Sequence, residues 1–584
     1  MKLITVSIFL LSIATCVASS AQTYTTLASF DGTNGRVPQG QLVQGRDGNF
    51  YGTTVEGGAG SGADCNANCG TVFKVTTGGK ITALHQFCTQ TGCPDGNSPQ
   101  AGLIQATDGN FYGTTIGGGK AGHGTVFKIT SAGDLTTLYN FCSQPNCTDG
   151  DYPTAGLVQG TDGNFYGTTA TGGVYLGTSV ICATIIFNGN FGCGTVFKLT
   201  PKGELTTLYN FCSKSNCTDG YQPLAGLLQA TDGNFYGTAY GGGGGGGGGV
   251  NCESDCGTIF KITPQGTLTT VYNFCSKPDC ADGAYPSSNV IQAKDGNFYG
   301  TSYRGNTVFK LSPAGKLTTL YNFCSQPECA DGLGPAAALM QATDGNFYGT
   351  TEDGGTGGNN GSGVVFKITA EGAFTTLYSF CSKPDCVDGS DGFAGLTQGT
   401  NGTIYGAAAL GGSSDYGVIF SLSMGLGPFV ETQTSSAKVG ATVYILGNNL
   451  TGATKVSFDG TPATIALDTS SAIATKVPAG AATGTLTVTT PSGTLRGNLP
   501  FRVTPQLDVF SPLMGPVGTQ VQITGVSLTQ TRAVTFGGVR ATEVSIDSDT
   551  QVTATVPADA KSGPITITTA GGTATTEASF DVTE

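Results

Sequence analysis

Short runs of apolar and β-branched residues alternate with turns rich in glycine, aspartate and asparagine along almost the whole chain. Runs of about four to eight such residues, bounded by turn residues, predict short β-strands. After the first 20 residues, no long apolar stretch repeats with the 3.6-residue period of a helix. The pattern therefore predicts an all-β protein.

The strand-like runs recur as a four-part unit. A GLIQA-like run is followed by NFYGTT, then by a GTVFKIT-like run, then by an LTTLYNF-like run. Turns such as TDG and SAG join the first strand to the second and the third to the fourth, since glycine accepts positive φ. The string DGNFYGT begins at Asp47, Asp108, Asp162, Asp232, Asp295 and Asp344, and a weaker copy begins at Asn401.

Seven four-stranded antiparallel units predict a seven-bladed β-propeller over residues 22–424, because radial packing buries both faces of each blade. The run TYTTLASF (23–30) precedes the first unit, and the last unit has no fourth strand after its third, at 417–422. We therefore expect the N-terminal run to complete the seventh blade and close the ring. An open solenoid would instead need a cap at each end.

The recurring pattern DGNFYGTT…GG…GTVFKIT..G.LTTLYNF resembles the GloVer-type tandem repeat of exported bacterial proteins over residues 23 to about 423. That resemblance implies an extracellular repeat protein and brings no activity with it. Residues 428–504 and 505–584 resemble each other, as in VGATVYILGNNL beside VGTQVQITGVSL. Both are similar to IPT/TIG domains, which implies two immunoglobulin-like β-sandwiches that serve as spacers or interaction modules; the spacing of short strands agrees.

The N-terminus has the pattern of a secretory signal peptide. Lys2 precedes an apolar stretch that ends near Val17, and small residues precede Gln22. We expect residues 1–21 to be removed and the mature protein to be secreted or held at the cell surface. An alternative takes IATC as a lipobox that would make Cys16 a lipidated N-terminus. No second apolar segment is long enough to form a transmembrane helix.

Composition narrows the classes of partner. Charged residues are 11% of the chain and apolar residues 38%, which favours a folded protein over a disordered one. The net charge of −13 argues against a nucleic-acid partner, because such binding needs a basic surface. We expect instead an extracellular glycan or a cell-surface protein as partner.

The cysteines that remain after Cys16 form nine local pairs. An even number of cysteines in an exported chain predicts disulfides. Zinc sites and redox switches are the alternatives, but only His85 and His123 offer imidazole ligands, and no pair has C-x-x-C spacing. We predict no metal and no cofactor. The predicted disulfides are Cys65–Cys69, Cys88–Cys93, Cys142–Cys147, Cys182–Cys193, Cys212–Cys217, Cys252–Cys256, Cys275–Cys280, Cys324–Cys329 and Cys381–Cys386.

The loops point to one face of the propeller as the site of function. The six C-x4-C pairs lie in loops from a fourth strand to the next first strand, and the long insertions lie between second and third strands. In an up-and-down blade both loop types share one face, here called the loop face, and the tight turns share the other, here called the turn face. Variable loops on a rigid scaffold are where binding sites concentrate. The junction SFDGTNGRVP (29–38) lacks the cysteines and keeps an Asp-Gly turn at Asp31.

Residues that break the seven-fold repetition on this face are the predicted ligand-binding residues. Tyrosines there could stack on sugar rings or peptide groups, or could serve ordinary loop packing. The predicted residues are Tyr152, Tyr221, Tyr240, Tyr285, Tyr303 and Glu352.

Other polar residues recur in every blade or lack a defined geometry. The glutamine of the first strand, Gln44 in the first unit, could line the channel or satisfy backbone groups between blades. Repeated Asp-Gly turns are explained by turn capping, and they lack the oxygen cluster of a calcium loop. The carboxylates that are not repeated, which a glycosidase would need in a pair, are Glu56, Glu253, Asp255, Glu352 and Asp353.

The sequence therefore predicts a non-enzymatic exported binding or adhesion protein, in which the loop face presents the binding surface. No Ser-His-Asp set or G-x-S-x-G elbow is present, and we assign no catalytic residues. A carbohydrate-active propeller enzyme, either a hydrolase or a lyase, and a purely structural surface protein are the alternatives.

Overall fold

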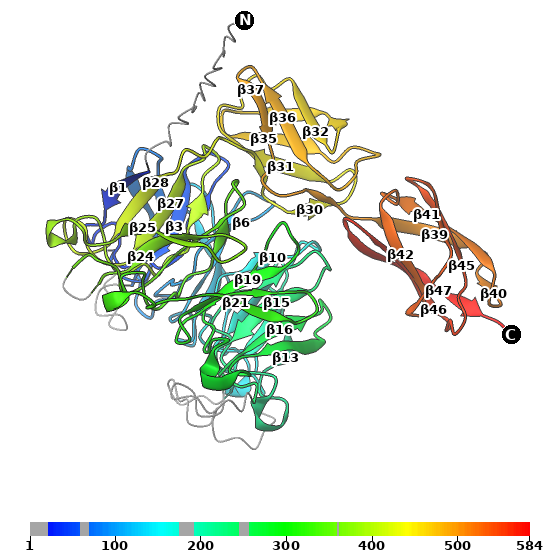
Figure 1. The fold of residues 1–584 in the computed structure, drawn as a ribbon, viewed down its shortest axis with the longest axis horizontal. Helices are drawn as coiled ribbons and strands as arrows, with labels where there is room; N and C mark the ends of the chain where they lie inside the picture. The colour runs from blue at the N-terminus through cyan, green and yellow to red at the C-terminus, as the bar shows by residue number, and fades with distance from the viewer. Residues whose placement is uncertain (1–21, 59–68, 175–191, 245–255, 359–360) are drawn as a thin grey trace, which may run out of the picture.

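The computed structural model describes residues 22–58, 69–174, 192–244, 256–358 and 361–584. The predicted signal peptide and Cys16 lie outside these ranges. Seven four-stranded antiparallel sheets form a ring, and two further β-domains follow it (Figure 1). The prediction of an all-β protein with a seven-bladed propeller and two sandwiches is confirmed.

In the first six blades the strands follow one another in chain order from the centre of the ring outwards. The strands of blades 1 to 3 are β2 (Val43–Gln44), β3 (Phe50–Thr54), β4 (Thr71–Val75), β5 (Ile81–Gln86), β6 (Ile104–Gln105), β7 (Phe111–Thr115), β8 (Thr125–Ile129), β9 (Leu135–Asn140), β10 (Val158–Gln159), β11 (Phe165–Thr169), β12 (Thr195–Leu199) and β13 (Leu205–Asn210). Those of blades 4 to 6 are β14 (Leu228–Gln229), β15 (Phe235–Ala239), β16 (Thr258–Ile262), β17 (Leu268–Asn273), β18 (Ile291–Gln292), β19 (Phe298–Ser302), β20 (Thr307–Leu311), β21 (Leu317–Asn322), β22 (Met340–Gln341), β23 (Phe347–Thr350), β24 (Val364–Ile368) and β25 (Phe374–Ser379).

The seventh blade closes the ring with both ends of the repeat region. Its strands are β26 (Thr397–Gln398), β27 (Ile404–Ala408), β28 (Val418–Ser423) and β1 (Thr23–Ser29). The N-terminal strand β1 pairs antiparallel with β28, from Thr23 opposite Ser423 to Ser29 opposite Val418. This is the closure that the unpaired N-terminal run predicts, and it holds the ring by hydrogen bonds between distant parts of the chain.

Aromatic rings join the blades to one another. In six of the seven blades the tyrosine of the second strand packs against the phenylalanine of the next blade, as in Tyr51 on Phe111 at a 4.0 Å centroid distance. The glycine that follows the tyrosine leaves room for the phenylalanine of the neighbouring strand, because a Cβ on Gly52 would lie 2.7 Å from the Phe73 ring. The recurrence of tyrosine followed by glycine in the second strand of every blade therefore has a packing cause.

Short 3-10 helices follow the fourth strands. They are η2 (Pro145–Cys147), η3 (Ser215–Cys217), η4 (Pro278–Cys280), η5 (Pro327–Cys329) and η6 (Pro384–Cys386).

Two β-sandwiches follow the propeller, each around its own apolar core. The first contains β29 (Glu431–Thr432), β30 (Ser436–Ala437), β31 (Thr442–Leu446), β32 (Lys455–Phe458), β33 (Thr461–Ala463), β34 (Ile465–Asp468), β35 (Ala472–Lys476), β36 (Leu486–Thr490), β37 (Gly493–Arg496) and β38 (Arg502–Val503). The second contains β39 (Gln506–Ser511), β40 (Met514–Gly515), β41 (Gln520–Val526), β42 (Thr531–Phe536), β43 (Val539–Arg540), β44 (Val544–Ser548), β45 (Gln551–Thr555), β46 (Gly563–Thr569) and β47 (Gly572–Val582).

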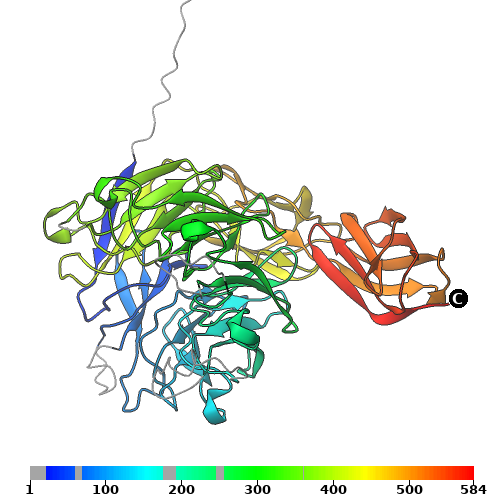
Figure 2. The same ribbon diagram turned by 60° about the horizontal axis from the view of Figure 1, so that its bottom comes forward.

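The first sandwich packs against the turn face of the propeller. The Arg46 guanidinium lies 3.3 Å from the centroid of the Tyr444 ring and donates a 2.7 Å hydrogen bond to Gln433. The buried Arg502 donates to the carbonyl of Ala230, at 3.2 Å, in another blade. The second sandwich extends away from the ring in both views (Figures 1 and 2). The turn face is therefore covered in part, and the loop face lies on the other side.

Candidate functional site

The two kinds of loop on the loop face are tied together within each blade. Isolated β-bridges join the loop that enters a blade to the loop between its second and third strands, as in Asp151 with Thr171 and Tyr221 with Gly241. The same relationship joins Ser390 to Leu410 in the seventh blade. These bridges hold the loop face in a defined shape, which is the condition for a preformed binding site.

A cavity of about 450 Å³ lies at the centre of the loop face, and we call it the vestibule. Its floor ring has one residue from each of the seven loops that enter a blade, and Tyr240 and Tyr303 rise beside this ring. The seven ring residues are Gln39, Gln100, Thr154, Leu224, Ser287, Ala336 and Phe393. Tyr240 and Tyr303, each of which follows a YGTT-like run, thus lie at the mouth of the channel.

Three of the predicted tyrosines lie together on this side. The Tyr240 and Tyr285 rings are 4.9 Å apart between centroids, at an interplanar angle of 38°. The Arg304 guanidinium lies 5.8 Å from the centroid of the Tyr285 ring. Adjacent aromatic faces with a cationic neighbour offer a surface on which a planar or ring-shaped ligand can stack.

Tyr303 and Glu352 form a polar pair between neighbouring blades. The Tyr303 hydroxyl donates a 2.7 Å hydrogen bond to Oε2 of Glu352. This bond to the carboxylate, with burial, raises the pKa of Tyr303 to about 12. Burial raises the pKa of Glu352, the Tyr303 hydrogen bond opposes that rise, and the nearby negative charge of Asp353 adds to it. The predicted residues Tyr240, Tyr285, Tyr303 and Glu352 are therefore neighbours in space.

An acidic region adjoins this pair. Burial, followed by the negative charges of Asp353, Glu352 and Asp415, raises the pKa of Asp391 to about 6. Asp391 lies in the loop that enters the seventh blade, and its backbone is in the left-handed region at φ 61°. A carboxyl group with a pKa near neutrality can donate or accept a proton under ordinary conditions.

The other two predicted tyrosines are placed differently. Tyr221 packs over the backbone of Gly241, where a Cβ on Gly241 would lie 2.1 Å from the tyrosine ring, and it contacts the core cluster around Cys217. Tyr152 occupies a left-handed position at φ 53° in the loop that enters the third blade. Of the predicted residues, only Tyr240 and Tyr303 are among the described residues that line the vestibule.

Disulfides fix the loops that lead from one blade to the next. They are Cys88–Cys93, Cys142–Cys147, Cys212–Cys217, Cys275–Cys280, Cys324–Cys329 and Cys381–Cys386. Cys69, Cys193 and Cys256 are also disulfide-bonded, while Cys65, Cys182 and Cys252, their predicted partners, lie outside the described residues, as do Glu253 and Asp255.

A buried aspartate organises each of these cysteine loops. Asp282 is fully buried and accepts hydrogen bonds from the Tyr272 hydroxyl at 2.6 Å and from the backbone N–H and hydroxyl of Ser276 at 2.9 and 2.8 Å. In the first blade His85 replaces the tyrosine and bonds Asp95 at 2.8 Å. The repeated aspartate is therefore structural, as turn capping predicts.

The junction without cysteines was aligned wrongly from the sequence. Gly35 has a φ of 122°, and a Cβ added at this position would lie 2.5 Å from the Thr54 hydroxyl. A Cβ added at Gly150, the turn glycine of another blade junction, would likewise lie 2.6 Å from the Thr169 side chain. The conserved turn position is therefore Gly35 rather than Gly32, and Asp31 instead caps its own turn through hydrogen bonds from Thr33 and Asn34.

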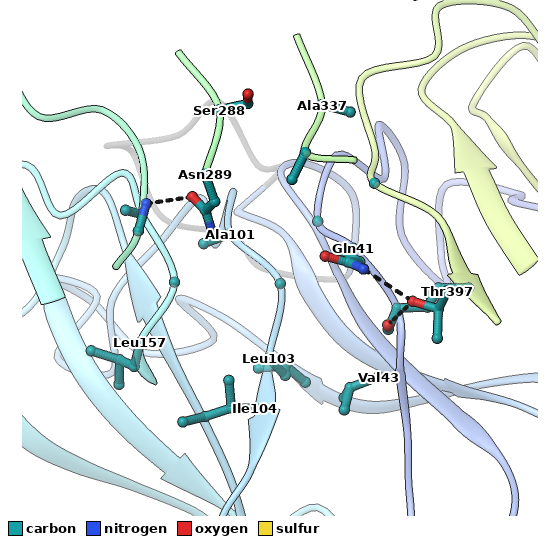
Figure 3. Close-up of a pocket in the computed structure, with 18 of the residues that line it drawn as sticks. Gln41, Val43, Ala101, Leu103, Ile104, Leu157, Ser288, Asn289, Ala337 and Thr397 are labelled. Atoms are coloured by element: carbon teal, nitrogen blue, oxygen red, sulfur yellow. Dashed lines mark hydrogen bonds between the residues drawn. The ribbon is translucent and has the colours of Figure 1, made fainter. Parts of the chain in front are cut away.

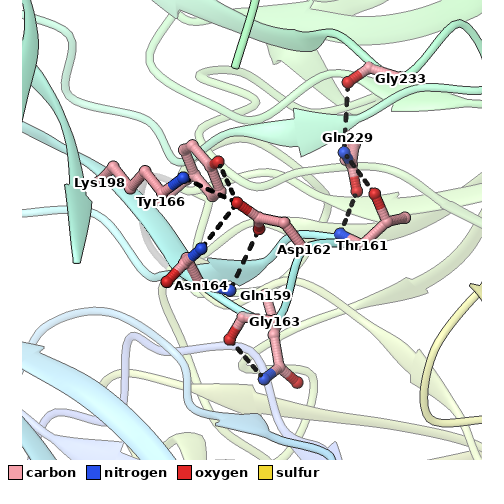
Figure 4. Close-up of polar contacts among 9 residues, drawn as sticks. All are labelled: Gln159, Thr161, Asp162, Gly163, Asn164, Tyr166, Lys198, Gln229 and Gly233. Carbon is pink, nitrogen blue, oxygen red and sulfur yellow. Dashed lines mark hydrogen bonds and ion pairs between the residues drawn. The ribbon is translucent and has the colours of Figure 1, made fainter. Parts of the chain in front are cut away.

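The first-strand glutamines form a closed ring of backbone contacts, which is the second of their two interpretations. Gln229 donates to the carbonyl of Gly233 in its own turn and accepts from the N–H of Thr161 in the preceding blade, at 3.2 and 2.9 Å (Figure 4). The ring closes where Gln44 accepts from the N–H of Thr400 at 2.9 Å. The members of the ring are Gln44, Gln105, Gln159, Gln229, Gln292, Gln341 and Gln398.

Beneath the vestibule lies a second cavity of about 530 Å³, which we call the inner channel. The seven residues of the vestibule ring also line this cavity, so the two spaces are continuous. Gln41 and Asn289 reach toward its centre, above the apolar side chains of Val43 and Ile104 (Figure 3). Glu431, Thr432, Gln433 and Leu446 of the first sandwich line its far end.

Three residues of this region escaped the sequence analysis. Arg46 stands where the other turns have Thr107, Thr161, Thr231, Lys294, Thr343 and Thr400. Because most of the equivalent positions have threonine, Arg46 stands out in the sequence and could have been recognised as a residue with a special role. Asp391 also departs from the repeat, whereas Glu431 lies outside the repeats and nothing in the sequence places it beneath the channel.

The repeated units match the family model of the Gloeobacter/Verrucomicrobia repeat over residues 15–251, 176–420 and 251–465. The chain belongs to this repeat family. Beyond the repeats of this Gloeobacter/Verrucomicrobia repeat protein, IPT/TIG domain models match residues 428–503 and 505–582. No curated protein sequence matches the chain.

Several solved structures share part of the fold. The virginiamycin B lyase from Staphylococcus aureus in complex with quinupristin is 14% identical, covers 69% of this chain and 99% of its own, and has a TM-score of 0.43. The extracellular domain of the hybrid two component system BT4673 from B. thetaiotaomicron is 10% identical, covers 82% and 59%, and has a TM-score of 0.42. A surface glycan-binding protein from Prevotella bryantii is 18% identical, covers 25% and 38%, and has a TM-score of 0.20. At these identities the likenesses concern the fold alone.

In the described part of the Gloeobacter/Verrucomicrobia repeat protein, no helix has the length and apolar character needed to cross a membrane.

Proposed function

We propose that this chain is an exported, non-enzymatic binding protein whose vestibule takes an extracellular glycan. The observation that carries the proposal is that Tyr240 and Tyr303 line one preformed cavity and that Tyr285 packs against Tyr240. Sugar rings present apolar C–H faces that pack on aromatic rings, and their hydroxyls bond to carboxylates and amides. The Glu352 carboxylate and the side chains of Gln39 and Gln100 supply such groups.

The rigidity of the site supports binding at low entropic cost. The disulfides restrict the loops, the bridges join them in pairs, and the glutamine ring holds the blades in register. A ligand that enters a preformed site does not have to order the loops, and the affinity is correspondingly higher.

A glycan array on the mature protein, with Tyr240→Ala and Tyr303→Ala beside the wild type, tests the proposal. We expect binding of a defined glycan class and a loss of about tenfold or more in each variant. Tyr416→Ala is a control for a half-buried loop tyrosine outside the vestibule lining. An absence of binding, or binding that both variants retain in full, would reject the vestibule as a glycan site.

The elevated pKa of Asp391 supports a second candidate, a glycosidase or lyase. Such an enzyme needs an acid that remains protonated near neutral pH and a second carboxylate nearby, for which Glu352 is available. Hydrolysis or elimination of a polysaccharide that is lost in both Asp391→Asn and Glu352→Gln would favour the enzyme over the binding protein.

A further inference from the structure

The inner channel is the continuation of the vestibule and has a protein floor. Its seven upper lining residues are those of the vestibule ring, so a ligand enters from the loop face. Residues Glu431 to Gln433 lie at the opposite end, and Gln433 is fixed there by accepting from Arg46 and donating to Gln105. A polymer therefore cannot thread through the ring, and only the end of a chain can fill the channel.

The floor carries an isolated negative group. Glu431 is the single ionisable side chain among the described residues that line the channel. Burial raises its pKa to about 7, and no charged or hydrogen-bonding neighbour within the described ranges contributes to that rise. Glu431 is half-buried, and no hydrogen bond or ion pair to its carboxylate is present within the described ranges, so a cation that enters the channel and reaches the carboxylate is stabilised there.

The walls of the inner channel carry side chains that can form hydrogen bonds with a ligand inside it. Gln41 uses its Nε2 to bind the carbonyl of Leu396 at 2.7 Å, and Asn289 uses its Oδ1 to accept from Gly226 at 2.6 Å. An acceptor on Gln41 and a donor on Asn289 are left to face the channel (Figure 3).

We propose that the inner channel binds one terminal sugar unit that carries a free amine, and that this ammonium group pairs with the Glu431 carboxylate. The inference rests on the proposed glycan-binding function and adds the ligand's chemistry and its end-on orientation. The volume of about 530 Å³ lies within the range of small-molecule sites. A charge-assisted hydrogen bond in such a site is stronger than a neutral one, so the amine distinguishes this unit from its acetylated form.

Two tetrasaccharides of N-acetylglucosamine, each with one amine left free, test the inference in the full chain by calorimetry. One has the free amine on a terminal unit and the other on an internal unit. We expect the terminal-amine isomer to bind about tenfold more tightly than the internal isomer. In Glu431→Gln, which keeps the size of the side chain, this preference should vanish while the affinity for the fully acetylated tetrasaccharide stays within twofold.

Equal affinities of the two isomers for the wild type, or a preference that Glu431→Gln retains, would overturn the inference. If either outcome occurs while Tyr240→Ala still weakens the binding of all tetrasaccharides, the proposed function stands and the channel inference alone fails. If no tetrasaccharide binds, the proposed function fails for this glycan class. Glucosamine then serves as an independent probe, because it should lower the pKa of Glu431 measured by carboxyl ¹³C NMR, and an unchanged pKa would overturn the inference as well.

Discussion

The hydroxyl of Tyr303 donates a 2.7 Å hydrogen bond to the carboxylate of Glu352, and this bond joins the fifth and sixth blades at the mouth of the channel. Both residues depart from the repeat in the same sequence column, directly after the YGTT-like run. Their pairing shows that departures from symmetry in adjacent blades can be coupled in space. The ionisation of Glu352 can therefore be used to detect changes at Tyr303, which lines the vestibule.

Replacing Tyr303 by Phe should raise the pKa of Glu352. The hydrogen bond from Tyr303 stabilises the ionised carboxylate, so its removal leaves burial and the charge of Asp353 unopposed. A ¹³C NMR titration of the Glu352 carboxyl group measures the change directly. Tyr240→Phe is the matched control, since it removes a hydroxyl at the same position of the fourth blade; an equal shift in both variants would contradict the prediction.

Asn in place of Asp391 should stabilise the protein at pH 7. The folded-state pKa of about 6 exceeds the ordinary value of 3.8, so the folded state binds the proton more tightly than the unfolded chain. The stability from protonated Asp391 is complete below pH 4 and is lost as the pH rises through 6. We expect a gain on the order of 1 kcal/mol at pH 7, after allowing for solvent screening, and none at pH 4.

Chemical denaturation of the wild type and Asp391→Asn at the two pH values measures this difference. Asparagine tolerates the left-handed backbone at this position, so the substitution adds little strain. Asp353→Asn provides an independent check, because removing that charge should lower the pKa of Asp391. A gain that is the same at pH 4 and pH 7 would show that ionisation is not its cause.

The repeats made most of the propeller predictable, for a physical reason. A pattern that occurs seven times must fit the same environment seven times, so recurrence favours structural roles for Gln229 and Asp282. The unpaired run before the first unit had one available partner, the edge of β28. The neighbourhood of Tyr240, Tyr285 and Tyr303 was predictable only as a shared face, because the loop geometry that brings two rings to 4.9 Å is not encoded by spacing.

The floor of the channel was not predictable, because it depends on the docking of two different folds. Glu431 follows the last repeat, and its burial arises only when the first sandwich lies on the turn face. The alignment error at Gly35 has a related cause. The junction at 29–38 has no cysteines that mark the turn in the sequence. Its equivalent turn glycine is recognised only in the structure, where the Thr54 and Thr71 hydroxyls pack against Gly35.

Asp282→Asn should destabilise the protein by about 1–3 kcal/mol, since Oδ2 accepts from Tyr272 and Ser276 and Oδ1 accepts from the N–H of Lys277, so an amide NH₂ in place of either oxygen would face a donor. Asp279→Asn in the same loop is the control: Asp279 is exposed, and its substitution should change the stability by less than about 0.5 kcal/mol. Urea denaturation under oxidising conditions compares the two. Equal losses of stability in the two variants would show that the buried carboxylate of Asp282 does not organise the loop.

Gln229→Glu should also destabilise the protein, by about 1–3 kcal/mol, because the ionised side chain can no longer donate to the carbonyl of Gly233. The carboxylate retains its acceptor for the N–H of Thr161, so the variant separates the two contacts. Gln229→Ala, which loses both, should be less stable still. Thermal unfolding of the three proteins would contradict the prediction if the alanine variant were as stable as the wild type.

Arg46→Ala should loosen the first sandwich from the propeller. The guanidinium stacks 3.3 Å from the Tyr444 ring centroid and bonds Gln433, and a partly buried contact of this kind contributes about 1–2 kcal/mol. Arg46→Lys should retain only part of the effect, since an ammonium group lacks the planar fork that stacks and bonds together. For Arg46→Ala we expect calorimetry to show the sandwich unfolding at a lower temperature than the propeller, and small-angle scattering to show a larger radius of gyration than in the wild type.

Lys294→Ala, at the equivalent position of the fifth blade, should leave both measurements unchanged. A single unfolding transition in Arg46→Ala, with an unaltered radius, would show that the other contacts hold the floor of the channel in place without Arg46.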